Sequence, residues 1–256
     1  RHYRNEGKFS PDLSGAFIKF DTDSRISLRA GKLGTEFYML ADSRLVSYSY
    51  LTVRPPGDFY GTLPFTYVEG VDGLLTIPWN EGLIRGKLFT GFTCEKVPLG
   101  DRQWDLSKSL MSGGYVDFQK GDWQWRVSYA DIRFKNDLPL TDLMAELNAS
   151  GPSQAANELS VANKLASFYS AGMAYDSGPI QLQLMLGRTQ QESAVFENAT
   201  SGYLIAGYRI SEVTPFAGYS WLKTEPRELA TGVPNVGAGA VLNATVASVM
   251  ADSHAD

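Results

Sequence analysis

Hydrophobic and polar residues alternate with a period of two along much of the chain, which is the pattern of β-strands with one apolar and one polar face. The clearest stretches read Trp-Gln-Trp-Arg-Val-Ser-Tyr from Trp123 and Ile-Gln-Leu-Gln-Leu-Met-Leu from Ile180. Weaker alternation predicts further strands at 14–20, 25–33, 67–77, 84–92, 112–119, 165–176, 204–210 and 213–223. The pattern therefore predicts an all-β protein of ten strands.

The connections between these strands alternate between short and long. Tight turns of residues that tolerate turn geometry are expected at 21–24, 78–82, 120–121, 176–178 and 211–212. Long segments lie between them at 34–66, 95–111, 134–164, 190–201 and 224–256, well beyond ordinary hairpin lengths. Two of the long segments predict helices, at 140–147 and at 153–165, where Ser153 is a candidate N-cap. The chain thus reads as five hairpins whose tight turns share one end.

Short turns on one rim and long loops on the other are typical of antiparallel up-and-down outer-membrane β-barrels, whose strands turn apolar side chains outward and polar ones inward. A soluble barrel has the opposite polarity, and alternation alone does not separate the two. The loop asymmetry favours the membrane barrel, because a soluble barrel has no reason to lengthen one rim. Aromatic residues near the strand ends are candidates for its interfacial girdles, or simply reflect strand propensity: Phe20, Tyr67, Trp79, Phe118, Trp123, Tyr175 and Trp221.

Composition narrows the alternatives. No apolar run reaches the roughly 18 residues that a spanning helix needs. The net charge of −5 comes with no basic block or stripe, so nucleic acid is not expected as a partner. Cys94 is the only cysteine, which excludes an intramolecular disulfide and a cysteine-based zinc cluster.

The residues that carry enzyme chemistry are sparse. His2 and His254 lie at the extreme ends, outside every predicted strand, so no histidine-based catalytic site is expected. Glu69 and Asp72 are close in sequence, but a spacing of three places them on opposite faces of a strand. The glycine-rich segment 232–239 lacks the Lys-Ser/Thr ending of a phosphate loop and is interpreted as a flexible loop. We expect no enzyme activity, metal or cofactor.

Several sequence blocks resemble a porin family of Gram-negative bacteria. They are Leu28-Arg29-Ala30-Gly31-Lys32-Leu33, Val53-Arg54-Pro55-Pro56, Tyr60-Gly61, Gly70-Val71-Asp72, Gly202-Tyr203, Gly207-Tyr208-Arg209 and Thr214-Pro215-Phe216. The resemblance covers most of residues 13–224, and the Arg-Pro-Pro block is its most specific part. It implies a pore-forming barrel of roughly sixteen strands in the outer membrane. The chain, taken as one partial barrel domain over 1–256, is therefore expected to lack both ends of the barrel and to form an open, curved sheet.

In such a barrel the charged residues on the polar face would line a water-filled pore. The predicted pore-lining residues are Lys19, Arg29, Asp72, Arg85, Lys87, Asp117, Arg126, Arg188 and Arg209. Basic residues outnumber acidic ones in this set, which favours anions. The alternative is that the basic side chains pair with acids on other strands or on loops that fold inward.

The prolines of the Arg54, Pro55, Pro56 block stiffen a long connection that also contains Tyr60. We expect this loop to fold inward and constrict the pore; the alternative is that it braces the rim. The predicted function is passive diffusion of small polar solutes or ions. Expected partners are the lipid bilayer and lipopolysaccharide of the outer membrane, with a homotrimer as an option. The competing functions are a soluble all-β carbohydrate-binding module and a barrel enzyme with active residues outside this chain.

Overall fold

A computed structural model describes residues 13, 15–22, 25–39, 51–52, 55–61, 65–99, 102–150 and 153–251. Ten strands form one antiparallel sheet in which every strand pairs with its neighbour along the chain, apart from an inserted hairpin after β4. The strands are β1 (Ala16–Asp21), β2 (Ile26–Gly34), β3 (Tyr67–Trp79), β4 (Gly82–Thr93), β7 (Ser109–Lys120), β8 (Trp123–Arg133), β9 (Leu165–Ser177), β10 (Ile180–Gln191), β11 (Asn198–Tyr208) and β12 (Phe216–Glu225). The all-β prediction of ten strands is confirmed.

The tight turns all lie at one end of the sheet, as predicted. In the turn between β3 and β4, Asn80 and Glu81 both have positive φ values, of 47° and 61°. Two consecutive residues of positive φ are the conformation that matches the twist of a two-residue hairpin. Gly121, Gly178 and Ser211 supply the positive φ in three of the other turns. The long connections consequently gather at the opposite end.

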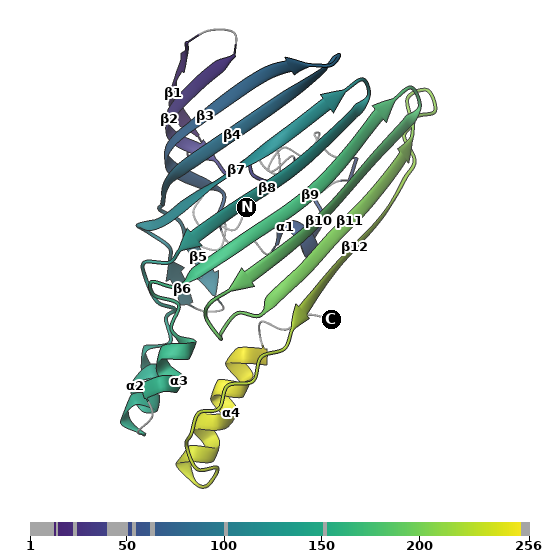
Figure 1. Ribbon diagram of the computed structural model, residues 1–256. Helices are drawn as coiled ribbons and strands as arrows, with labels where there is room; N and C mark the ends of the chain where they lie inside the picture. Colours follow the sequence, from purple (N-terminus) through teal and green to yellow (C-terminus); the bar gives the residue numbers. More distant parts are fainter. Residues whose placement is uncertain are drawn as a thin grey trace.

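The sheet is a curved wall, open at both edges (Figure 1). Among the described residues β1 and β12 are the two edge strands, and they do not pair with each other. α1 (Gly57–Tyr60) lies behind the wall in this view, against one face of the sheet. The helices α2 (Thr141–Ala149), α3 (Ser153–Leu159) and α4 (Ala238–Ala251) extend beyond its lower end. The structure thus forms an open sheet, and not a closed ten-stranded barrel.

The two faces of this wall differ in what covers them. We call the face against which α1 packs the inner face, and the other the outer face. Large apolar side chains of the outer face are exposed, among them Ile18 (80%), Leu88 (75%) and Val127 (60%). The buried core lies on the inner side, where Phe89, Phe168 and Tyr203 of the sheet pack against the connection between β2 and β3.

Three parts of the long connections differ from the sequence-based expectation. The second predicted helix ends at Leu159, because Asn163 takes a left-handed φ of 64° and Leu165 already pairs with Arg133 as the start of β9. The hairpin of β5 (Lys96–Leu99) and β6 (Arg102–Asp105) was not predicted. Neither was α4, which begins within the segment interpreted as a flexible glycine-rich loop. The first helix, predicted at 140–147, is confirmed as α2.

Candidate pore lining and inward segment

Most of the predicted pore-lining residues lie on the inner face. Lys19, Arg29 and Asp72 are register partners across β1, β2 and β3. Arg85, Asp117 and Arg126 are register partners across β4, β7 and β8. Because side chains alternate between faces with a period of two, register partners point to the same side of the sheet. Two rows of charge therefore cross the inner face.

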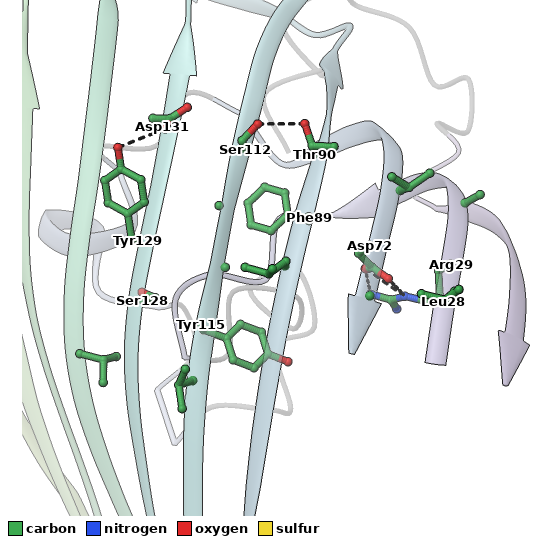
Figure 2. A pocket seen from close by; sticks show the side chains of 18 of the residues that line it. Leu28, Arg29, Asp72, Phe89, Thr90, Ser112, Tyr115, Ser128, Tyr129 and Asp131 are labelled. Carbon is green, nitrogen blue, oxygen red and sulfur yellow. Dashed lines mark hydrogen bonds and ion pairs between the residues drawn. The ribbon is translucent and has the colours of Figure 1, made fainter. Parts of the chain in front are cut away.

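The first ionic cluster joins Arg29, Asp72, Lys87 and Glu36. The Arg29 guanidinium donates to both carboxylate oxygens of Asp72, with a distance of 3.0 Å from Nε to Oδ1 (Figure 2). Lys87 Nζ lies 2.9 Å from Asp72 Oδ2 and also pairs with Glu36, while Arg29 Nη2 lies 2.8 Å from Glu36 Oε1. The Lys87 side chain is only 4% exposed. Each carboxylate thus bridges both cations.

The second ionic cluster centres on Asp117, whose side chain is fully buried. Arg126 donates to both of its carboxylate oxygens, at 2.6 Å and 2.8 Å, and Arg85 Nη2 lies 3.2 Å from Asp117 Oδ2. Arg126 Nη1 also donates to the backbone carbonyls of Glu36 and Tyr38, at 3.2 Å and 2.8 Å. Arg126 therefore ties the sheet to the connection between β2 and β3.

Glu36 is a member of the site that the sequence did not reveal. It lies two residues beyond the end of β2, inside a long connection without periodicity, so nothing in the pattern assigned it a face. The one signal in the sequence was that Glu36 is an acidic residue shortly after β2, the strand that carries Arg29. Its pairing with Arg29 and Lys87 matches the alternative that basic residues of the inner face pair with acids of an inward-folded loop.

Arg188, Arg209 and Lys19 are not part of these clusters. The prediction that Arg188 lies on the polar inner face was wrong. Arg188 is separated from Leu182, Leu184 and Leu186 by an even number of residues, so its side chain points with theirs to the outer face. There Arg188 pairs with Glu225 at 2.6 Å. Arg209 lies beyond β11 near the tight turns and pairs with Asp176 at 2.7 Å. Lys19, on the edge strand β1, pairs with Asp21 at 3.1 Å.

The connection between β2 and β3 folds onto the inner face. We call its described residues, 35–39, 51–52, 55–61 and 65–66, the inward segment. Pro55 and Pro56 immediately precede α1, and Arg54 lies outside the described residues. Within α1, Phe59 and Tyr60 are buried; the Phe59 ring lies 5.3 Å from that of Tyr203, and the Tyr60 hydroxyl lies 3.2 Å from the Tyr203 hydroxyl. The segment thus reaches from β2 across to β11.

Aromatic rings and two glycines fit the inward segment to the sheet. The Phe37 ring lies 6.0 Å from Phe168 on β9 and 6.3 Å from Phe89 on β4, and Phe65 lies 5.8 Å from Phe168. A Cβ at Gly187 would come within 2.9 Å of the Phe59 ring, and one at Gly207 within 2.9 Å of Leu51. The absence of side chains at these positions allows the close approach.

The outer face carries a continuous band of aromatic rings near the tight turns. Neighbouring rings lie 4.6 to 5.7 Å apart in the order Trp79, Phe118, Trp125, Trp123 and Tyr175. Four of these were predicted girdle residues; Trp125 was not. Trp221 stacks on Tyr219 at 5.9 Å, Tyr67 contacts Lys32, and Phe20 is exposed on the same face.

A shallow hollow of about 1270 Å³ lies on the outer face between β1 and β8. Apolar side chains such as Leu28, Leu88 and Val127 surround it. Two pairs of polar side chains in its lining are hydrogen-bonded to each other, Thr90 with Ser112 at 2.9 Å and Tyr129 with Asp131 at 3.1 Å (Figure 2). The hydroxyl groups of Thr90, Ser112 and Tyr129 are thus hydrogen-bonded within the protein.

Other chemistry is limited in the described part of the chain. No group of three or more His, Cys, Asp and Glu side chains there could hold a metal ion. No described helix has the length and apolarity to cross a membrane. Glu69 and Asp72 lie on opposite faces of β3, as predicted from their spacing. His2 and His254 lie outside the described residues.

Comparisons with known proteins give little. No protein-family model matches the sequence, and no curated protein matches it significantly. Among solved structures, the outer-membrane expressed OmpT of Vibrio cholerae has a TM-score of 0.37 and 14% sequence identity, over 79% of this chain and 68% of that chain. A likeness this weak does not identify the family or the function of this chain.

Proposed function

We propose that the chain forms part of the wall of an outer-membrane pore for small polar solutes, as expected for a porin. The observation that carries the proposal is the contrast between the two faces of one sheet. The outer face exposes aliphatic side chains above a band of Trp and Tyr rings, while the inner face holds the ionic clusters. Outer-membrane barrels place apolar and aromatic side chains toward lipid and polar ones toward the lumen.

The polarity of the faces favours this function over a soluble carbohydrate-binding module. A soluble curved sheet buries its apolar side chains on the concave side and exposes polar ones. Here Ile18, Leu88 and Val127 are exposed on the outer face, and their transfer out of water is favourable by roughly 25 cal/mol per Å². Hydrocarbon is the environment that covers such a surface. Sugar-stacking rings would need polar neighbours, and the outer face mostly offers aliphatic ones.

The inward segment is proposed as the constriction of the pore. Phe59 and Tyr60 occupy the inner face in front of β11, and Glu36 and Arg126 join the segment to the ionic clusters. A solute that follows the inner face has to pass these groups. We therefore propose that the segment sets the width of the path and that its charges set the selectivity.

The proposed selectivity is a modest preference for anions. Across β1 to β8, where the ionic clusters lie, the inner face carries Lys19, Arg29, Arg85, Lys87 and Arg126, which face Asp21, Glu36, Asp72 and Asp117. Five basic and four acidic groups leave a small positive excess, which lowers the barrier for anions only slightly.

In lipid the open edges of β1 and β12 need partners, because unpaired backbone groups are costly there. We propose that further strands supply them.

Four measurements on the full-length protein test the proposed function. The protein should fractionate with the outer membrane, migrate differently on gels before and after heating, and give stepwise conductance in planar bilayers. The reversal potential in a salt gradient should have the sign of weak anion selectivity. A soluble, monodisperse protein without conductance would contradict the pore, and cation selectivity would contradict only the charge argument.

A further inference from the structure

A second cavity, of about 790 Å³, lies where the helices meet the sheet at the long-loop end. Thr189, Ala199 and Thr224, which are register partners on the inner face of β10, β11 and β12, form part of its lining. α2 and α4 contact each other and contribute further lining residues. Its volume lies within the range of roughly 300–1000 Å³ that is usual for small-molecule sites.

The walls of this cavity are largely apolar. α4 contributes Val241, Thr245 and Val249, which follow one another at a spacing of four and so form a stripe on one face of the helix. Leu242, Val246 and Met250, one position further along, are buried, so α4 is held firmly while its neighbouring stripe lines the cavity. Leu143 of α2 and Phe196 add an aliphatic and an aromatic surface.

The charged groups of the lining are mostly acidic. Asp142, Glu146 and Glu197 are three carboxylates against one guanidinium, Arg102, which leaves a net charge of −2. Arg102 donates to the backbone carbonyl of Pro139 and lies 3.8 Å from Asp142, so these two charges offset each other and the net charge comes from Glu146 and Glu197. Glu197 is buried in this region. A bound molecule would therefore meet apolar walls and a negative potential.

We propose that this cavity binds small organic cations with an aromatic or aliphatic body, such as aryl-alkyl ammonium compounds. Apolar walls favour burial of the body, Phe196 adds an aromatic ring to these walls, and the carboxylates favour positive over negative charge. The position of the cavity on the inner side makes it an entry site for the proposed pore. Only this role in entry rests on the proposed function; the binding itself does not.

Three ligands of similar shape test the charge preference. Benzyltrimethylammonium, benzyl alcohol and benzoate share one ring and carry charges of +1, 0 and −1. Isothermal titration of the detergent-solubilised full-length protein should give binding of the cation at least about tenfold tighter than that of benzoate, with the alcohol between. Equal affinities, or a preference for benzoate, would overturn the proposal.

Matched variants of α4 locate the binding. Thr245→Trp fills the cavity and should abolish binding of the cation. Ser248→Trp places the same side chain at an exposed position of α4 that does not line this cavity, and it should leave binding intact. Unchanged binding in Thr245→Trp would overturn the site. Glu146→Gln should reduce the preference for the cation, whereas Asp105→Asn, which lies outside the cavity, should not.

Conductance separates this inference from the proposed function. If the unmodified protein binds the cation but forms no channel in bilayers, the pore fails and the binding site stands. If the protein conducts and none of the three ligands binds, the site fails and the pore stands. With both intact, benzyltrimethylammonium should reduce ion current more than benzoate does, and Thr245→Trp should lose this block.

Discussion

At the scale of single residues, the inner face is organised by carboxylates that each serve two cations. Asp72 and Glu36 both bridge Arg29 and Lys87, and Asp117 bridges Arg85 and Arg126. A buried charge without a partner is strongly unfavourable, so removal of one acid affects two bases at once. Selectivity and the attachment of the inward segment therefore depend on the same side chains.

Glu36→Gln should increase anion selectivity. The substitution removes one negative charge from the inner face and frees part of the charge of Arg29 and Lys87, which now have only Asp72 between them. We expect the reversal potential in a salt gradient to shift toward the anion equilibrium potential. Glu69→Gln removes the same charge on the outer side of β3 and serves as the control. A shift of equal size in both variants would contradict the assignment of Glu36 to the path.

The alternation of residues along the strands predicted the face of the sheet on which most of these charged side chains lie. The prediction was wrong for Arg188 and did not place Glu36. Arg85, Asp117 and Arg126 sit in regular strands, where a period of two fixes the face. Arg188 also sits in a regular strand, and parity with Leu186 would have placed it on the outer face. Glu36 could not be placed, because it lies in a connection whose path is determined by tertiary contacts with the sheet.

At the scale of elements, the inward segment is held by ring packing against a sheet that provides space for it. Phe59→Ala removes a ring that is only 1% exposed and contacts Tyr38, Tyr60 and Tyr203, a loss of about 3 kcal/mol or more of packing energy. We expect the segment to become sensitive to protease and single-channel conductance to rise. Phe92→Ala, on the exposed outer face, is the control.

The same contact can be disturbed from the side of the sheet. Gly187→Leu places a side chain where the Phe59 ring now lies, so it should displace the segment and also raise conductance although no residue of the segment is substituted. Unchanged conductance and protease resistance in both Phe59→Ala and Gly187→Leu would mean that the segment does not restrict the path.

Neighbouring strands also provide a test of which face meets lipid. Val127→Lys introduces a charge in the middle of the apolar outer face, which in a bilayer costs about 2–4 kcal/mol. Gln119→Lys introduces the same charge at an exposed position of the inner face. Urea unfolding in lipid vesicles should show strong destabilisation by the first substitution and little by the second. Equal small effects would favour a water-exposed outer face, as in a soluble module.

Whether an element could be predicted depended on what stabilises it. The ten strands of the sheet were predictable because apolar outer positions alternate with inner positions that are more often polar, which leaves a period of two in the sequence. α4 has no charged residue between Ala238 and Ala251 and contains Gly, Val and Thr, so neither propensity nor a polar face indicated a helix. It is stabilised by packing of Leu242, Val246 and Met250, and tertiary contacts of that kind cannot be read from local pattern.

At the scale of the whole molecule, the two ends of the sheet are different. Tight turns close one end, and the helices, the β5–β6 hairpin and the inward segment start from the other (Figure 1). In bacterial outer-membrane barrels the short turns face the periplasm and the long loops face the exterior. The proposed function therefore fixes an orientation, with Cys94, one residue beyond β4, on the outside of the cell.

Cys94 reports this orientation because it is exposed and is the only cysteine of the chain. A membrane-impermeant maleimide should label it in intact cells. Partial burial and the nearby Glu69 carboxylate raise the pKa of the Cys94 thiol, so labelling should be slow at neutral pH and accelerate as pH rises through that raised pKa. Glu69→Gln removes one cause of the shift and should speed labelling at neutral pH.

A cysteine at the other end of the sheet provides the complementary measurement. In a Cys94→Ser background, Asp122→Cys puts an exposed thiol in the tight turn between β7 and β8, at the opposite end of the same sheet. It should react only after the outer membrane is permeabilised, because the reagent is too large to pass the pore when the inward segment is in place. Labelling of Asp122→Cys but not of Cys94 in intact cells would reverse the orientation. Labelling of both only after lysis would contradict exposure of either end at the cell surface, and with it the proposed placement in the outer membrane.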